Sequence, residues 1–96
     1  MLRHTGIRRF ALGGLYVTTG AAAALDEAGE QPLTYIARHA RGDWGDVCAE
    51  DAAANERSIT QGFRILSAYT LKSGGRLYVI TEADRSATTV LMSDEY

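Results

Sequence analysis

The spacing of apolar residues along the chain changes after Gly62 from a helical period to alternation over residues 63–71. Residues 12–19 hold β-forming side chains and predict a first strand. An alanine-rich stretch follows and predicts a helix that Thr19 caps, that continues to Ala28 and that Gly29 ends.

A second helix is predicted to begin at Pro32, because proline suits the first helical position, and to end at Gly42. Its apolar residues recur at helical spacing and form the face expected to be buried: Leu33, Ile36, Ala37 and Ala40. The opposite side is expected to carry Tyr35, Arg38, His39 and Arg41.

A third helix is predicted over about 47–61, with Asp46 as its N-cap and Gly62 as its end. After Gly62 the period becomes two, and the alternation over 63–71 predicts a strand. A strongly apolar run over 76–82 predicts a central strand, and residues 87–92 predict a last one. The resulting order, β-α-α-α-β-β-β, predicts an α+β fold in which helices pack on one face of a small, mostly antiparallel sheet. We expect a single domain over 12–96, preceded by a loose basic arm over 1–11.

Composition narrows the classes of function. A chain of 96 residues, 46% of them hydrophobic, supports one core, and no apolar run approaches the ~18 residues of a membrane span. The net charge of −2 disfavours strong nucleic-acid binding, although a local basic patch stays open. The single cysteine, Cys48, excludes a disulfide framework and is expected to be a small buried side chain. We therefore expect a protein without a cofactor or a metal.

Two segments, 38–46 and 81–88, are unusually rich in polar side chains and are expected to lie beside the core. The candidate binding residues lie in or near these segments: Arg38, Asp43, Trp44, Asp46, Asp51, Asn55, Arg64, Tyr69, Thr81, Asp84, Arg85, Ser86 and Thr88. For the arginines, salt bridges to nearby acids are the competing interpretation. For Trp44, the competing interpretation is an aromatic side chain buried in the core between two helices.

One hypothesis gives these residues a catalytic role. His39 has a side chain that titrates near neutral pH and would act as general acid/base, with Glu82 as its carboxylate partner. Arg64 and Arg85 would hold a phosphate, and a hydroxyl of Tyr69 or Thr88 would assist. The competing interpretation of His39 is a hydrogen-bonded structural residue.

The same segments resemble a family of small, uncharacterised bacterial proteins labelled "plasmid-related", which occur with plasmids, phages and integrative elements. The likeness covers about residues 12–96. It rests on a series of motifs: Arg38-His39-x-x-Gly42-Asp43-Trp44-Gly45-Asp46, Glu50-Asp51, Asn55-Glu56, Arg64-x-Leu66-Ser67-x-Tyr69 and Thr81-Glu82-Ala83-Asp84-Arg85-Ser86-x-Thr88. The family commonly ends in Leu-Pro-x-Glu-Tyr, whereas this chain ends in Met92-Ser93-Asp94-Glu95-Tyr96 without the proline. The resemblance implies a cytoplasmic protein in a bacterial, mobile-element setting.

Two functions from different classes follow. The first is a non-enzymatic accessory protein that binds an unidentified protein and modulates host defence or plasmid maintenance. The alternative is a small metal-independent ribonuclease or toxin-like enzyme that uses His39, Arg64 and Arg85. A third possibility, nucleic-acid binding through the arginines of residues 3–9, predicts an affinity that falls steeply with salt.

Overall fold

The structure, a computed structural model, describes residues 7–96, so most of the expected arm lies outside the described residues. Three helices, four strands and a short 3-10 helix follow one another in the described part: β1 (Gly14–Val17), α1 (Thr19–Ala28), α2 (Pro32–Ala40), α3 (Ala49–Gln61), β2 (Ile65–Thr70), β3 (Arg76–Thr81), β4 (Ala87–Met92) and η1 (Ser93–Glu95). The α+β class and the element order are confirmed.

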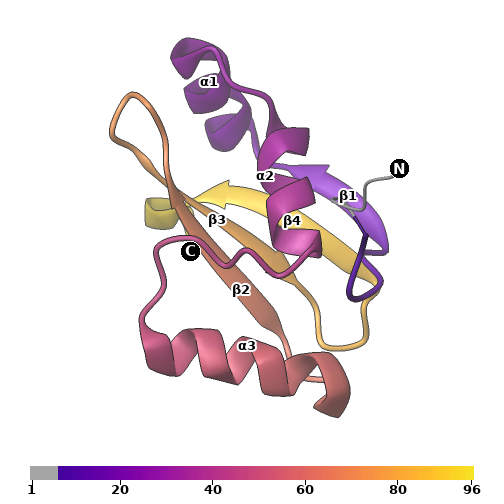
Figure 1. Ribbon diagram of the computed structural model, residues 1–96. Helices are drawn as coiled ribbons and strands as arrows, with labels where there is room; N and C mark the ends of the chain where they lie inside the picture. Colours follow the sequence, from indigo (N-terminus) through magenta and orange to yellow (C-terminus); the bar gives the residue numbers. More distant parts are fainter. Residues whose placement is uncertain (1–6) are drawn as a thin grey trace, which may run out of the picture.

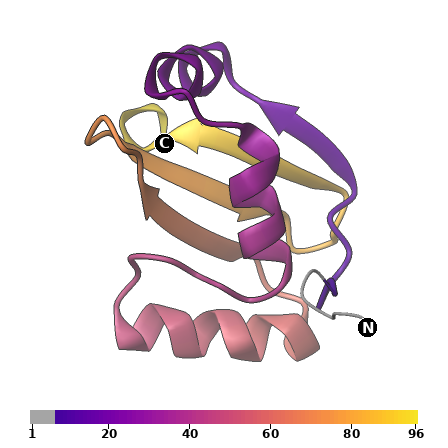
Figure 2. The same cartoon turned by 45° about the horizontal axis from the view of Figure 1, so that its top comes forward.

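The four strands form one sheet in the order β1-β4-β3-β2, so β3 and β4 are interior and β1 and β2 are the edges. β1 pairs with β4 in parallel, and the other two pairings are antiparallel. Helices α1 and α2 lie over one face of the sheet, and α3 runs along the β2 edge (Figures 1 and 2). Within residues 7–96, neither α1, α2 nor α3 lies over the opposite face of the sheet in these views.

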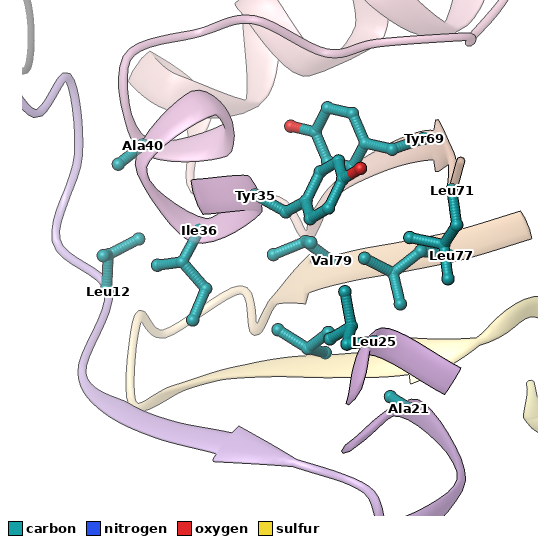
Figure 3. Close-up of a cluster of buried hydrophobic side chains, with 11 residues drawn as sticks. Leu12, Ala21, Leu25, Tyr35, Ile36, Ala40, Tyr69, Leu71, Leu77 and Val79 are labelled. Atoms are coloured by element: carbon teal, nitrogen blue, oxygen red, sulfur yellow. The ribbon is translucent and has the colours of Figure 1, made fainter. Parts of the chain in front are cut away.

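The hydrophobic core lies between this helix-covered face and α1 and α2. Leu25 of α1 and Tyr35 and Ile36 of α2 pack against Leu77 and Val79 of β3 (Figure 3). Leu77 and Val79 are fully buried, and each buried side chain of this size stabilises the fold by about 1.5–3 kcal/mol.

The first strand is shorter than predicted because its neighbours have other roles. Leu12 turns into the core, and Gly13 adopts a left-handed φ of 67°. At the other end Thr18, not Thr19, caps α1: its Oγ1 accepts a hydrogen bond from the Ala21 N–H at 3.1 Å. The predicted cap was one residue too late because both neighbouring threonines fit the preference.

Helix α2 is rotated relative to the prediction. Leu33 is 66% exposed and Ala37 is also exposed, whereas Tyr35 and His39 are buried with Ile36 and Ala40. The predicted face counted hydrophobic residues only. The observed face buries the larger ring of Tyr35, whose hydroxyl donates to Glu30 Oε2 at 2.6 Å, and places His39 where two hydroxyls bind it.

The start of α3 corrects two expectations. Cys48 is the N-cap, with Sγ accepting from the Asp51 N–H at 3.4 Å, and it is exposed rather than buried. Asp46 does not cap the helix because it serves the sheet instead: its N–H donates to the Ala68 carbonyl, and its Oδ2 accepts from Thr70.

The last residues of the expected arm are docked on the domain. The Arg9 guanidinium forms a two-pronged ion pair with Glu56 at 2.7 and 3.0 Å. The Phe10 ring stacks on Trp44 with centroids 6.1 Å apart. The partners in these two contacts are 47 and 34 residues apart along the chain, so a local sequence pattern does not reveal them.

Candidate functional site

His39 lies at the centre of a buried chain of polar side chains. It is 0% exposed, and its Nδ1 and Nε2 lie 2.6 Å from Ser67 Oγ and 2.8 Å from Thr81 Oγ1. Thr81 Oγ1 lies 2.7 Å from Thr88 Oγ1, and the Thr88 hydroxyl donates to the Leu12 carbonyl at 2.8 Å. This series of hydrogen bonds therefore joins α2, the three antiparallel strands β2, β3 and β4, and the segment before β1.

The Leu12 carbonyl, at the end of this hydrogen-bonded series, determines which group donates in each bond between it and His39. A carbonyl can only accept, so the Thr88 hydroxyl donates its one proton to the Leu12 carbonyl and must accept a hydrogen bond from Thr81. Thr81 has then spent its own proton and must accept from His39 Nε2–H, which leaves Nδ1 to accept from Ser67. Burial keeps His39 neutral by lowering its pKa, and the bond to Thr81 then selects the Nε2–H tautomer.

The catalytic pairing of His39 with Glu82 is not present in this geometry. Both ring nitrogens are bonded to hydroxyls, and burial lowers the pKa of His39 to about 4. Glu82 is exposed, and within residues 7–96 its carboxylate has no hydrogen bond or ion pair. The arrangement is that of a structural histidine.

The first polar segment is closed on itself. Arg38 Nε donates to Asp43 Oδ2 at 2.7 Å, and its guanidinium lies 4.6 Å from the centroid of the Tyr69 ring. The hydrogen bond from Arg38, the largest cause, holds the pKa of Asp43 below its usual range. The Tyr69 hydroxyl donates to the Asp43 carbonyl at 2.6 Å, so Arg38, Asp43 and Tyr69 brace the loop that follows α2.

Trp44 is a core aromatic between α2 and α3, as the competing interpretation predicted. It is 6% exposed, its ring meets that of His39 edge-on, and its Nε1 donates to Glu56 Oε2 at 3.1 Å. Its side chain is therefore not available as an anchor for a partner without rearrangement.

Arg85 and Arg64 do not form a common clamp. The Arg85 guanidinium donates to four backbone carbonyls, those of Ser58, Phe63, Glu82 and Ala83, at 2.6–3.2 Å. It joins the end of α3 to the β3–β4 turn, where Arg85 itself has a φ of 61°. The Arg64 guanidinium lies elsewhere, 5.5 Å from the centroid of the Tyr96 ring.

We predict that Arg85→Lys lowers the free energy of unfolding by about 2 kcal/mol, because one ammonium group cannot bond to all four carbonyls that the two guanidinium nitrogens reach. Arg57→Lys is the matched control, since Arg57 is an exposed residue of α3. Urea unfolding followed by circular dichroism measures both. Equal stability of the two variants would show that the four bonds contribute nothing.

Two structural roles are found among the remaining candidates, in the β3–β4 turn and at the start of β2. Asp84 Oδ1 accepts from the Ser86 N–H and shapes the β3–β4 turn. Asn55 of α3 satisfies both backbone groups of Leu66, donating at 2.8 Å and accepting at 3.1 Å. Asp51 lies at the surface of α3. Within residues 7–96, no three His, Cys, Asp or Glu side chains gather closely enough to hold a metal ion.

Sequence reasoning missed a surface on the helix-free side of the sheet. The register places Tyr16, Thr89, Ile80 and Leu66 in one row across four strands, and Leu91, Tyr78 and Ala68 in the next. Tyr96 folds back over these rows and meets Tyr78 edge-on with centroids 5.7 Å apart. We call the surface formed by Tyr16, Leu66, Tyr78, Thr89, Tyr96 and Arg64 the aromatic face.

The aromatic face continues into a hollow of about 190 Å³ between β2 and α3. Five residues line it: Asp51, Ala54, Asn55, Arg64 and Leu66. Three of the sequence candidates, Asp51, Asn55 and Arg64, thus meet at one place. The alternation in β2 and β3 indicates such a face, but which face the helices leave open depends on their packing.

No family model, no curated protein and no solved structure matches the chain. Within residues 7–96 no helix is both long enough and apolar enough to cross a membrane.

Proposed function

We propose that the protein is a non-enzymatic binding module whose aromatic face docks a protein partner. The observation that carries the proposal is the arrangement of Arg64, Tyr78 and Tyr96 on the sheet face that no helix covers (Figures 1 and 2). Tyrosine and arginine are the residue types enriched at the energetic centres of protein interfaces.

The hollow beside Arg64 gives this face a specific chemistry. Within residues 7–96 the Arg64 guanidinium has no ion pair or hydrogen bond, and Tyr96 beneath it is 59% exposed. A carboxylate on the partner would pair with the guanidinium while an apolar side chain fills the hollow against Leu66. We therefore infer a partner segment that combines an acidic and an apolar residue.

The polar motifs support this assignment indirectly. Their side chains close ion pairs and hydrogen bonds inside the domain, and within residues 7–96 every buried side-chain nitrogen and oxygen has a partner. The ribonuclease alternative needs His39 to reach a substrate, and a fully buried His39 offers no route to one. A cytoplasmic, mobile-element setting rests on the family resemblance of the sequence.

We predict that the double variant Arg64→Ala/Tyr96→Ala weakens partner binding at least about tenfold, because loss of one interface anchor costs more than about 1 kcal/mol. The immobilised wild-type protein captures the partner from bacterial extract, and calorimetry with the purified partner measures the dissociation constant. Leu33→Ala is the matched control, since Leu33 is 66% exposed on the opposite side of the sheet.

Two results would contradict the proposal. One is retention of the same proteins by the double variant and the wild type, and the other is capture that nuclease treatment abolishes. The second result would point instead to bases stacking on Tyr78 and Tyr96. An unchanged melting temperature in the double variant shows that the loss of binding is not a loss of folding.

A further inference from the structure

The two edges of the sheet are treated very differently by the rest of the chain. At the β2 edge, Gly45 forms a parallel bridge with Ala68, flanked by bonds from the Ala68 N–H to Trp44 and from the Asp46 N–H to Ala68. Asn55 then satisfies Leu66. The outward backbone groups of this edge strand are therefore largely occupied.

At the β1 edge the described residues provide no such cover. Gly14 and Thr18 donate to Ser86 and Val90 of the β4 side, so alternation turns the amide and carbonyl groups of Leu15 and Val17 outward. Within residues 7–96, β1 pairs with β4 alone, and Figure 2 shows it at the rim of the sheet.

The sequence of β1, Gly14-Leu15-Tyr16-Val17, lacks the features that block pairing at an edge. It contains no charged residue and no proline. Leu15, Tyr16 and Val17 are 47%, 58% and 36% exposed, so apolar side chains accompany the outward backbone groups. Such an edge is a template for another strand.

We propose that β1 pairs antiparallel with β1 of a second copy, which joins two sheets into one of eight strands. A two-fold axis through Tyr16 places Leu15 of each copy opposite Val17 of the other. These pairs use the outward amides and carbonyls reciprocally, in the manner of a hydrogen-bonded antiparallel pair. The strand is uncharged, so the pairing brings no like charges together.

The same axis places the two Tyr16 side chains opposite each other in a non-hydrogen-bonded pair, where side chains come closest. Tyr16 belongs to the aromatic face, so the two aromatic faces become neighbours on one surface. In this respect the inference extends the proposed function, because a dimer would present two docking sites. Its own basis is the open edge.

The interface is small, and this sets its strength. Four residues of edge bury less than the ~1,200 Å² of a standard interface, so we expect a dissociation constant on the order of 100 µM. Analytical ultracentrifugation of the full chain from about 10 µM to 1 mM should show a monomer–dimer equilibrium. Tyr16→Lys should leave a monomer throughout, because two ammonium groups would face each other on the axis.

Tyr96→Lys is the matched control, because Tyr96 is 59% exposed on the same face but lies away from β1. It should keep the dimer while weakening partner binding, whereas Leu15→Lys, whose side chain lies on the other side of β1 from the aromatic face, should remove the dimer and keep partner binding. The inference and the proposed function therefore fail separately.

Cross-linking tests the register. In a Cys48→Ser background, Tyr16→Cys should form a disulfide-linked dimer at least about tenfold faster than Leu15→Cys under the same mild oxidation, because only position 16 faces itself across the axis. The wild-type protein, whose exposed Cys48 lies on another element, measures random encounters. A monomer at 1 mM, or equal cross-linking rates at positions 15 and 16, would overturn the proposal.

Discussion

Gly45→Ala is expected to lower the free energy of unfolding by about 3–4 kcal/mol. Gly45 has a φ of 74°, which costs an L-residue about 1–2 kcal/mol. A Cβ there would also lie 2.0 Å from the Ala68 carbonyl oxygen and 2.6 Å from the Tyr69 ring. Relieving that overlap requires the loop to leave β2, which breaks the bridge between Gly45 and Ala68 and adds about 2 kcal/mol.

Gly62→Ala separates the two causes. Gly62 has a similar φ of 78°, but a Cβ there meets nothing within 4 Å. Its replacement should cost only the conformational part, about 1 kcal/mol. Urea unfolding by circular dichroism gives both values. If the two alanine variants lost the same stability, the close approach of Gly45 to β2 would have no energetic weight.

The stability of the protein is expected to fall by about 3 kcal/mol between pH 7 and pH 4 because of His39 alone. Burial lowers its pKa to about 4 from an ordinary value near 6.5, so the unfolded chain binds a proton at this position where the folded chain does not. The stabilisation is present above pH 6.5 and is lost as the pH falls toward 4. Carboxylates with lowered pKa, such as Asp43, add a further loss at lower pH.

His39→Gln provides the comparison, because an amide can accept from Ser67 and donate to Thr81 without titrating. The unfolding free energy of the wild type minus that of the variant should be greatest at pH 7 and should decrease toward pH 4, because only the wild type loses the His39 contribution. Parallel curves for the two proteins across this range would show that His39 titrates normally in the fold. Both proteins contain His4, so its contribution cancels in the difference.

The prediction of element types succeeded in the last third of the chain. β4 was predicted with its observed bounds and β3 ends one residue earlier than predicted, because runs of β-forming residues between turn residues are typical of strands. The alternating run predicted as a strand over 63–71 forms the shorter strand Ile65–Thr70. The ends of β1 and the caps of α1 and α3 were missed by one to several residues. At those positions several neighbours satisfy the same preference, and a tertiary contact selects between them.

The candidate site shows a similar division. The residue types of the two polar segments identified side chains that interact strongly, and in the structure nearly all of them form hydrogen bonds or ion pairs within the domain. What the residue types could not show is that Arg38, Trp44 and Arg85 interact with their own chain instead of a ligand. A guanidinium that binds four carbonyls and one that binds a phosphate have the same local sequence, because the choice depends on which groups the fold brings within 3 Å.

The sequence by itself determined the class of fold, the order of its elements and the number of cores, since these follow from hydrophobic period and chain length. Only the tertiary structure decided which side of α2 is buried, that His39 is held by hydroxyls from residues 28 and 42 positions away, and that one edge of the sheet is occupied while the other is open. The physical reason is the separation of the interacting residues along the sequence. Periodicity expresses what each residue requires of solvent, whereas hydrogen bonds and edge pairing depend on partners distant in the chain, which become neighbours only when the core forms.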